Sequence, residues 1–294
     1  MPGMTDHDDV SEDRGLKELF TAYPYETVEV FVPELIAQRG RPTSVEAVQQ
    51  ELPLPDLGDP SRFLDVALRC TWADGSQTLI VLVEHWSQAR KVDLDRVLWY
   101  VAGLRLRHAG AEVIPVVLVT DPGTQTVPDR LESAPLGRPV LDFRVQVVRI
   151  GPSDLPRLRS LQNRVAAMMQ ALALRQDAVE AAMAVLASML AAPGPIDDLR
   201  RFLPLALKLV KMSDADEARF RRRLREEPTM GNILDEIKAE GEARGEARGL
   251  IRTLRHQVAK GILTVDQAKT EIREMVAMGE IPAETGETAL KQLG

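Results

Sequence analysis

The sequence predicts an α/β protein in which a mixed sheet of about four strands is flanked by helices and followed by an all-helical C-terminal region. Two alternating segments joined by an Asp-Gly turn predict a hairpin over 62–85. A run that is apolar on both faces, 113–120, and an alternating segment, 140–150, predict two more strands. Helical spacing dominates after Gly151-Pro152. The predicted order is helix, strand, strand, helix, strand, loop, strand, then helices.

The N-terminal part supplies the first predicted helix. Residues 1–12 are acidic and predicted to be disordered, whereas 13–20 place their large apolar residues at helical spacing. A similar apolar pattern over 28–36 is broken by Pro33. Residues 40–61 are rich in proline and acids, so we expect a surface loop there.

The hairpin turn sets two acidic residues opposite each other. Asp74-Gly75 is the strongest short hairpin signal in the chain. A two-residue or a four-residue loop pairs Asp65 with Glu84, whereas a three-residue loop would break this register. Like charges at directly paired positions are destabilising unless something neutralises them. A divalent cation, which prefers hard oxygen ligands, is the natural candidate.

A structural interpretation competes with the metal site. Two acids on an exposed hairpin can simply be solvated, or paired with Arg62 or Arg69. However, the strand that carries Glu84 is apolar on both faces, which is typical of a central, buried strand. Burying a bare carboxylate is expensive, so this acid needs a partner. The residues alone therefore leave both interpretations open.

The remaining segments complete the predicted sheet and helices. Residues 92–108 have the apolar spacing of a helix, and 121–138 contain several prolines and glycines and are predicted to be a loop. The methionines of the helical region are expected to be core filler. The basic run Arg221–Arg225 predicts a solvated helix face, with a phosphate-contacting patch as the alternative.

We predict four parts along the chain: 1–12, 13–150, 151–228 and a helical tail, 229–294. The tail contains Gly241-Glu-Ala-Arg-Gly-Glu-Ala-Arg-Gly249, whose glycines would form a stripe on a helix. Either a flexible spacer or a self-association helix fits this repeat, so the tail is a candidate for homo-oligomer formation. Thr264-Val-Asp-Gln267 is a capping box that predicts a helix to about Met278, and another short helix follows Pro282.

Composition narrows the class of protein. The chain has 294 residues, a net charge of −7 and a pI of about 5.3, which argues against a protein that coats nucleic acid but allows local phosphate contacts. Its one cysteine, Cys70, excludes an internal disulfide and fits a reducing cytoplasm. The acidic N-terminus is unlike a signal peptide, and no apolar run approaches the length of a membrane span. We therefore expect a cytoplasmic protein without membrane contact.

Short motifs along residues 13–150 resemble those of a known family. They are Asp13 with Leu16-Lys17-Glu18-Leu19-Phe20, then Asp65, Val83-Glu84-His85-Trp86-Ser87, and Arg96 with Tyr100. Together these residues resemble the Rpn/YhgA-like family of recombination-promoting nucleases and transposases, associated with DNA recombination and mobile elements. That family belongs to the PD-(D/E)XK nuclease superfamily. The Gly-Glu-Ala-Arg repeat is similar to tails common in those proteins.

The resemblance implies a PD-(D/E)XK nuclease-like core and a DNA-directed hydrolase. Asp65 would be the motif aspartate, Glu84 the acid of the (D/E)XK element, and Glu18 the additional acid of the first helix. Asp65 and Glu84 would hold Mg²⁺ or Mn²⁺, which polarises the phosphate and lowers the pKa of the attacking water. The expected partner is DNA, cleaved as an endonuclease cleaves it, at internal phosphodiesters.

Position 86 departs from the family pattern, because Trp86 stands where the superfamily has lysine and this family often has glutamine. Indole cannot position a water or stabilise developing charge as an ammonium group does. We expect Trp86 to pack against Phe63. Gln88, Arg90 or Lys91 could reach back if the strand ends near Ser87, and Lys91 is the candidate replacement, with a solvated lysine as the alternative. His85 points to the face opposite Glu84 and is expected to be structural.

Three hypotheses follow from the sequence. The first is a metal-dependent DNA nuclease that uses Asp65 and Glu84. The second is a degenerate nuclease fold that acts as a DNA- or protein-binding or regulatory module, favoured by Trp86 and the acidic charge. The third is an oligomeric interaction protein whose tail after Thr229 does the work. Metal binding at the acidic pair discriminates between the first two.

Overall fold

The computed structural model describes residues 6–48, 65–75 and 78–227 and, in the C-terminal part, 251, 253–254, 256–258, 260, 263–279, 281 and 283–292. The chain divides into two compact units, Met1–Phe220 and Arg221–Gly294. The first unit holds both the sheet and most of the helices that follow residue 150. The first unit therefore ends at Phe220, well after residue 150, where the predicted part that contains the sheet ends.

The described strands of the first unit build a mixed sheet with the order β1-β2-β3-β4-β7. The first three strands are antiparallel neighbours, and β3, β4 and β7 are parallel neighbours. The mixed sheet is as predicted, with five strands instead of about four. Their bounds are β1 (Ser44–Ala47), β2 (Val66–Thr71), β3 (Leu79–Trp86), β4 (Glu112–Val119) and β7 (Gln146–Val148).

Strand β1 lies where the sequence predicted only a loop. It has four residues, too few to show a reliable alternation, and it pairs with β2 from Ser44 opposite Thr71 to Ala47 opposite Leu68. An ion pair between Arg69 and Glu46, 2.7 Å long, crosses the two strands on the exposed side. Strand β1 thus completes the edge beside the predicted hairpin.

The register of the β2–β3 hairpin is the one predicted from the turn. Val66 lies opposite Val83, and Leu68 lies opposite Val81. Gly75 has a φ of 68°, a left-handed conformation that glycine adopts without strain. Ser76 and Gln77 lie outside the described residues, so the loop is defined by its register. One residue beyond the Val66–Val83 pair, on the side away from the turn, Asp65 lies opposite Glu84.

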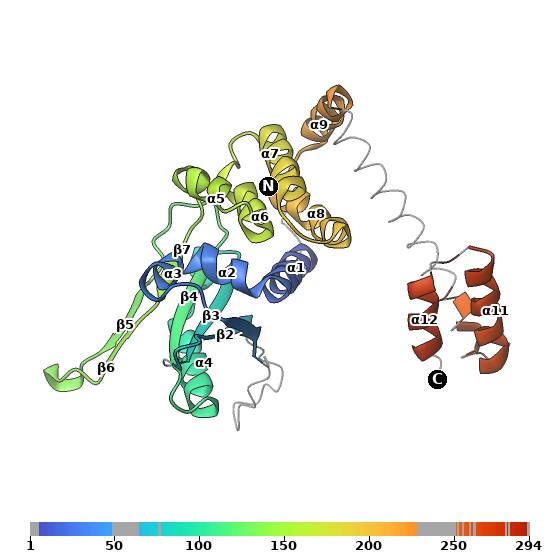
Figure 1. The fold of residues 1–294 in the computed structure, drawn as a ribbon. Helices are drawn as coiled ribbons and strands as arrows, with labels where there is room; N and C mark the ends of the chain where they lie inside the picture. Colours follow the sequence, from blue (N-terminus) through green and yellow to red (C-terminus); the bar gives the residue numbers. More distant parts are fainter. Residues whose placement is uncertain are drawn as a thin grey trace. The chain divides into compact units, whose positions relative to one another are not determined.

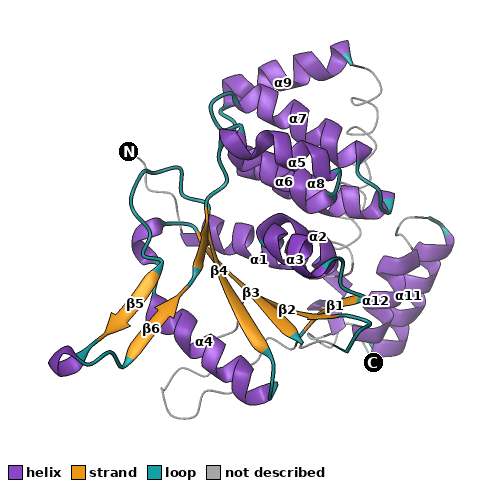
Figure 2. Ribbon diagram, turned by 60° about the vertical axis from the view of Figure 1, so that its left-hand side comes forward, coloured by secondary structure: helices purple, strands orange, loops and turns teal. Residues whose placement is uncertain are grey.

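Helices lie on both faces of this sheet (Figure 2). Helix α4 packs an apolar stripe against the face that carries Ile80 and Leu82. Helix α1 begins at Asp6, so residues 6–12, which were predicted to be disordered, are helical; acids near a helix N-terminus are favoured by the helix dipole. The four helices are α1 (Asp6–Ala22), α2 (Pro24–Phe31), α3 (Pro33–Arg39) and α4 (Leu94–Arg107).

A second, two-stranded sheet projects from the first unit (Figure 1). It consists of β5 (Arg130–Ser133), in the predicted loop, and β6 (Leu141–Arg144), the first half of the predicted strand 140–150. That predicted strand is divided because Val145 donates its N–H to Asp129, away from the main sheet. We call residues 130–144 the β5–β6 arm.

The helices after the sheet are packed through apolar faces. Met168, Met169, Met183 and Met189 are buried, as predicted for core filler. A Cβ on Gly15 of α1 would lie 2.7 Å from Leu205 Cδ2 of α8, so these two helices approach closely there. The bounds are α5 (Leu155–Leu161), α6 (Arg164–Ala173), α7 (Ala178–Ala191), α8 (Ile196–Val210) and α9 (Asp214–Glu226).

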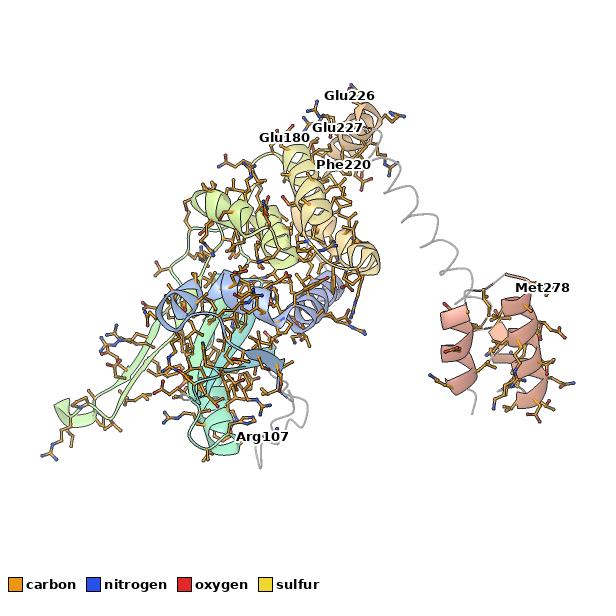
Figure 3. The ribbon with its side chains drawn as sticks, in the orientation of Figure 1. Arg107, Glu180, Phe220, Glu226, Glu227 and Met278 are labelled. Carbon is orange, nitrogen blue, oxygen red and sulfur yellow. The ribbon has the colours of Figure 1, made fainter. Side chains whose placement is uncertain are left out.

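The basic run Arg221–Arg225 lies on α9, and its arginines are exposed. Arg223 is 3.5 Å from Glu226 and 3.9 Å from Glu227, two acids near the end of α9 (Figure 3). The solvated helix face was the interpretation expected for this run. Over the part of the chain that the structure describes, none of the helices is both long and apolar enough to cross a membrane.

The second unit contains α11 (Val265–Ala277) and α12 (Ala283–Gln292). The predicted capping box is present: Thr264 Oγ1 accepts from Gln267 N at 3.2 Å, and Gln267 Oε1 accepts from Thr264 N at 2.8 Å. Both predicted helices of the tail are therefore found. The Gly241–Gly249 repeat lies outside the described residues.

Candidate active site

Asp65 and Glu84 meet at the edge of the sheet where the parallel strands β3 and β4 end. Asp65 immediately precedes β2, and its backbone N–H donates to Glu84 Oε1 at 3.0 Å. The two residues are 5% and 0% exposed. The carboxyl ends of parallel strands are where α/β sheets bind their ligands. The predicted face-to-face placement thus occurs in a buried setting at such an edge.

The Glu84 carboxyl is buried away from water, and the hydrogen bonds and positive charges around it offset only part of the cost of burying it in the ionised form. Burial raises its pKa well above 4.5, and the neighbouring Asp65 carboxylate raises it further; the Asp65 N–H and the Arg96 guanidinium offset only part of this. Oε2 is buried and accepts no hydrogen bond within the described structure, and Arg96 Nη2 lies 3.6 Å away. A buried carboxylate oxygen without a donor is a place where a cation would be stabilised.

The Asp65 carboxylate is held from two sides. Its Oδ1 lies 2.7 Å from Lys17 Nζ of α1, and its Oδ2 accepts the backbone N–H of His85 at 2.7 Å. Burial lowers the pKa of Lys17, but Asp65 and then Asp13 bring it above its ordinary 10.5. Lys17 is therefore firmly cationic and sits directly against one member of the acidic pair.

A chain of hydrogen bonds continues from this lysine to the neighbouring strand. Lys17 Nζ is 3.0 Å from Asp13, Asp13 Oδ1 is 3.0 Å from His85 Nδ1, and His85 Nε2 is 2.9 Å from Thr120 Oγ1. Burial raises the pKa of Asp13, but His85 and Lys17 outweigh it and leave that pKa below 3.8. His85 thus holds α1 and the end of β4 together, the structural role expected for it.

Helix α4 supplies the opposite wall. Arg96 Nη2 lies 3.6 Å from Glu84 Oε2, and Arg96 Nε donates to the Tyr100 hydroxyl at 2.8 Å. The Arg96 guanidinium carbon lies 5.3 Å from the centre of the Trp86 ring. Burial lowers the pKa of Arg96, but Glu84, Tyr100 and Asp65 together raise it above its ordinary value. Since adjacent residues of a strand point to opposite faces, Glu84 meets α4 while His85 meets α1.

Trp86 packs into the apolar cluster between the sheet and α4, in agreement with the packing role predicted for it. Its expected neighbour Phe63 lies outside the described residues. The indole is tied to Arg96 by a cation–π contact, and its buried Nε1 donates no hydrogen bond within the described structure. Trp86 therefore supports the guanidinium that faces Glu84.

Two other predicted site residues lie apart from the acidic pair. Glu18 of α1 is paired with Arg14 and with Arg201 of α8, each at 3.1 Å. Lys91 is exposed in the short 3-10 helix η1 (Ala89–Lys91), and in the described part of the chain it forms no ion pair with either carboxylate. The structure thus brings Asp65 and Glu84 together and leaves Glu18 and Lys91 outside their contacts.

The sequence interpretation overlooked Lys17 as a site residue. Its signal was present: Leu16, Leu19 and Phe20 form the buried face of α1, and Lys17 lies beside that face, where a long side chain can reach inward. Because the resemblance of the Leu16–Phe20 motif points to Glu18 and not to Lys17, the sequence offers Lys91 for the missing ammonium group. In the structure, the ammonium group beside Asp65 belongs to Lys17 of α1 and not to Lys91 of η1.

The donor set at this centre suits one kind of metal. Among the described residues, no group of three or more His, Cys, Asp and Glu side chains could enclose an ion. Mg²⁺ differs from zinc in that it is usually bound through one or two carboxylates and keeps several waters. Asp65, Glu84 and the donor-free Oε2 therefore fit Mg²⁺ or Mn²⁺ rather than a closed structural site.

Comparison of the chain with protein-family models, with curated proteins and with solved structures found no match.

Proposed function

We propose that this protein is a metal-dependent DNA endonuclease of the recombination-promoting type. The observation that carries the proposal is the buried, directly opposed pair Asp65 and Glu84. Glu84 Oε2 accepts no hydrogen bond within the described structure, and Lys17 Nζ lies 2.7 Å from Asp65 Oδ1. Two carboxylates that face each other inside the protein are destabilising, which favours the binding of a cation between them. The resemblance to Rpn/YhgA-like nucleases supplies DNA as the substrate.

Each residue has a defined task in this proposal. Asp65 and Glu84 would hold Mg²⁺ or Mn²⁺, which when bound polarises the phosphate and lowers the pKa of a water. The Lys17 ammonium stabilises the negative charge that develops on the phosphoryl oxygens. The water oxygen forms a bond to phosphorus and gives up a proton to solvent. The bridging phosphorus–oxygen bond breaks, and the leaving oxygen takes up a proton from solvent.

The residues around the pair act by positioning. Asp13 and His85 fix Lys17 and the Asp65 carboxylate, through the Lys17–Asp13 contact and the His85 backbone N–H. Arg96 keeps a positive charge 3.6 Å from Glu84 Oε2, which favours the ionised form of this carboxyl. Such fixed groups need little reorganisation during the reaction.

Cleavage of supercoiled plasmid tests the proposal. We expect nicking that requires Mg²⁺ or Mn²⁺ and that falls at least about 100-fold in Asp65→Ala and in Glu84→Gln. Glu46→Gln, which changes an exposed carboxylate of β1 outside the acidic pair, is the matched control and should nick like the wild type. Equal nicking by all four proteins would mean that the acidic pair does not cleave DNA.

A second function is favoured by the charges already present. Lys17 contacts Asp65 and Arg96 faces Glu84, so both carboxylates have a cationic neighbour without any metal. This is the pattern expected of a degenerate nuclease fold retained as a binding or regulatory module. Titration of Mn²⁺ into the DNA-free protein separates the two: binding that Glu84→Gln abolishes supports the nuclease, and absence of binding in the wild type supports the module.

A further inference from the structure

The β5–β6 arm presents an apolar tip that folding alone does not explain. Leu136 is 101% exposed and has a φ of 54°, a left-handed conformation that is a genuine outlier for a bulky side chain. Val140 is 72% exposed on the same tip. Strain combined with exposure of apolar surface points to a role in contact with something else.

The base of the arm is fixed. Leu131 and Phe143 pack against the cluster between the sheet and α4. Arg130 binds both oxygens of Asp142, at 2.7 and 2.9 Å, and lies 2.6 Å from Glu132. The arm therefore leaves the first unit as a ribbon of defined direction, and Figures 1 and 2 both show it running outward.

The charges of the arm are distributed unevenly. The two strand acids are engaged by Arg130, whereas the tip, residues 134–140 (Ala-Pro-Leu-Gly-Arg-Pro-Val), contains no acid and one arginine. Arg138 is exposed, and in the described part of the chain no acid pairs with it. The tip is thus apolar and cationic on a protein whose net charge is −7.

We propose that the β5–β6 arm enters a groove of duplex DNA and inserts Leu136 between base steps, with Arg138 against the adjacent backbone. Leucine and proline wedges, flanked by arginine, unstack base steps from the minor groove and kink the duplex. The substrate of the proposed nuclease is DNA, so this inference rests on the proposed function.

The tip chemistry favours DNA over a second copy of the chain. A wedge against protein needs a complementary apolar pocket, whereas the exposed Arg138 is free to contact a phosphate beside the wedge. The DNA backbone offers that anion at every step, and the stacked bases offer an apolar slot. Pro135 and Pro139 also remove backbone donors at the tip, which suits contact with base faces.

Bending and binding of DNA by the full chain test this inference. The probe is a duplex of about 30 base pairs with a fluorescent dye at each end, in EDTA to prevent metal-dependent cleavage. Affinity is read from anisotropy, and bending from energy transfer between the ends. Leu136→Gly suits the left-handed backbone, so this variant is expected to fold. Leu106→Ala removes another exposed leucine, on α4, and is the matched control.

We expect the wild type and Leu106→Ala to bend the duplex, and Leu136→Gly to lose the bend together with about tenfold in affinity. Arg138→Gln should lower the salt dependence of binding by about one phosphate contact. Equal bending by Leu136→Gly and Leu106→Ala would overturn the inference. So would a Leu136→Gly variant that loses only self-association, measured by sedimentation, since the arm would then contact a second copy.

Plasmid nicking by the same preparations keeps the two proposals separate. DNA bending that depends on Leu136, without nicking of plasmid, would support the insertion of Leu136 into DNA and reject the proposed nuclease activity. Metal-dependent nicking without bending by the wild type would reject the wedge and leave the proposed nuclease in place.

Discussion

The two hairpins of this protein place acidic side chains opposite each other in two different surroundings. Asp65 faces Glu84 at the buried end of β2–β3, and Glu132 faces Asp142 on the exposed β5–β6 arm. Burial and the neighbouring carboxylate raise the pKa of Glu84, whereas the hydrogen bond from Arg130 lowers the pKa of Asp142. The same cross-strand geometry is thus inexpensive in water and costly inside the protein.

The difference also lies in where the compensating cations come from. On the arm, Arg130 of the same hairpin contacts both acids. In the buried hairpin, Lys17 comes from α1 and Arg96 from α4, so each carboxylate depends on a different helix. A buried like-charged pair that needs two other elements to hold it is better explained by a function than by stability.

The largest expected effect comes from Lys17→Met, which removes the cation beside the buried Asp65, compared with Arg130→Met, which removes the cation beside the exposed acids. Lys17→Met leaves Asp65 buried without its ammonium partner and should lower the free energy of unfolding by about 3 kcal/mol. Arg130→Met acts in an exposed network and should cost less than about 1 kcal/mol. Urea unfolding of both variants checks this, and equal costs would remove the distinction between the two sites.

The pH dependence of stability should separate the hairpins next. In metal-free solution the folded protein keeps Glu84 protonated above 4.5, where the unfolded chain has released that proton. The free energy of unfolding therefore falls as pH rises from about 4.5 toward the raised pKa, and Glu84→Gln should flatten this part of the curve. Unfolding by urea in EDTA, from pH 4 to about 8, measures it.

Asp142→Asn is the control for this measurement. The pKa of Asp142 is below 3.8 in the folded protein, so its contribution is present above 3.8 and is lost as the pH falls through the lowered pKa. Its effect should appear only in acid. An unchanged pH profile for Glu84→Gln would show that Glu84 is ionised in the folded state.

The smallest effects should come from the turns. Gly75→Ala places a side chain at a φ of 68° and should destabilise the β2–β3 hairpin by about 1 kcal/mol. Leu136→Gly relieves the left-handed leucine and should stabilise the protein by about 0.5 kcal/mol, once the greater freedom of the unfolded chain is included. Thermal unfolding of the pair is the check, and destabilisation by Leu136→Gly would mean that Leu136 serves folding.

Local patterns were sufficient to predict the hairpin but not its surroundings. The Asp74-Gly75 turn and strand alternation determine the register, and with it the meeting of Asp65 and Glu84. Strand β1 and the arm were missed because four-residue strands carry too little periodicity.

Contacts between distant segments were the harder part of the site. The ion pair between Lys17 and Asp65 has no local signature, because it depends on how α1 docks on the sheet. The same docking turns Glu18, expected near the acidic pair, toward Arg201. Helical periodicity identifies the buried face of α1, but not which element each flanking charge will meet.

Two consecutive residues of α1 make the acidic centre dependent on the distant helices. Lys17 contacts Asp65 while Glu18 contacts Arg201 of α8, and Gly15 allows the two helices to lie close. The helix that presents the ammonium group to Asp65 is therefore also packed against α8. The first helix is thus a direct physical connection between the helical region and the acidic pair at the edge of the sheet.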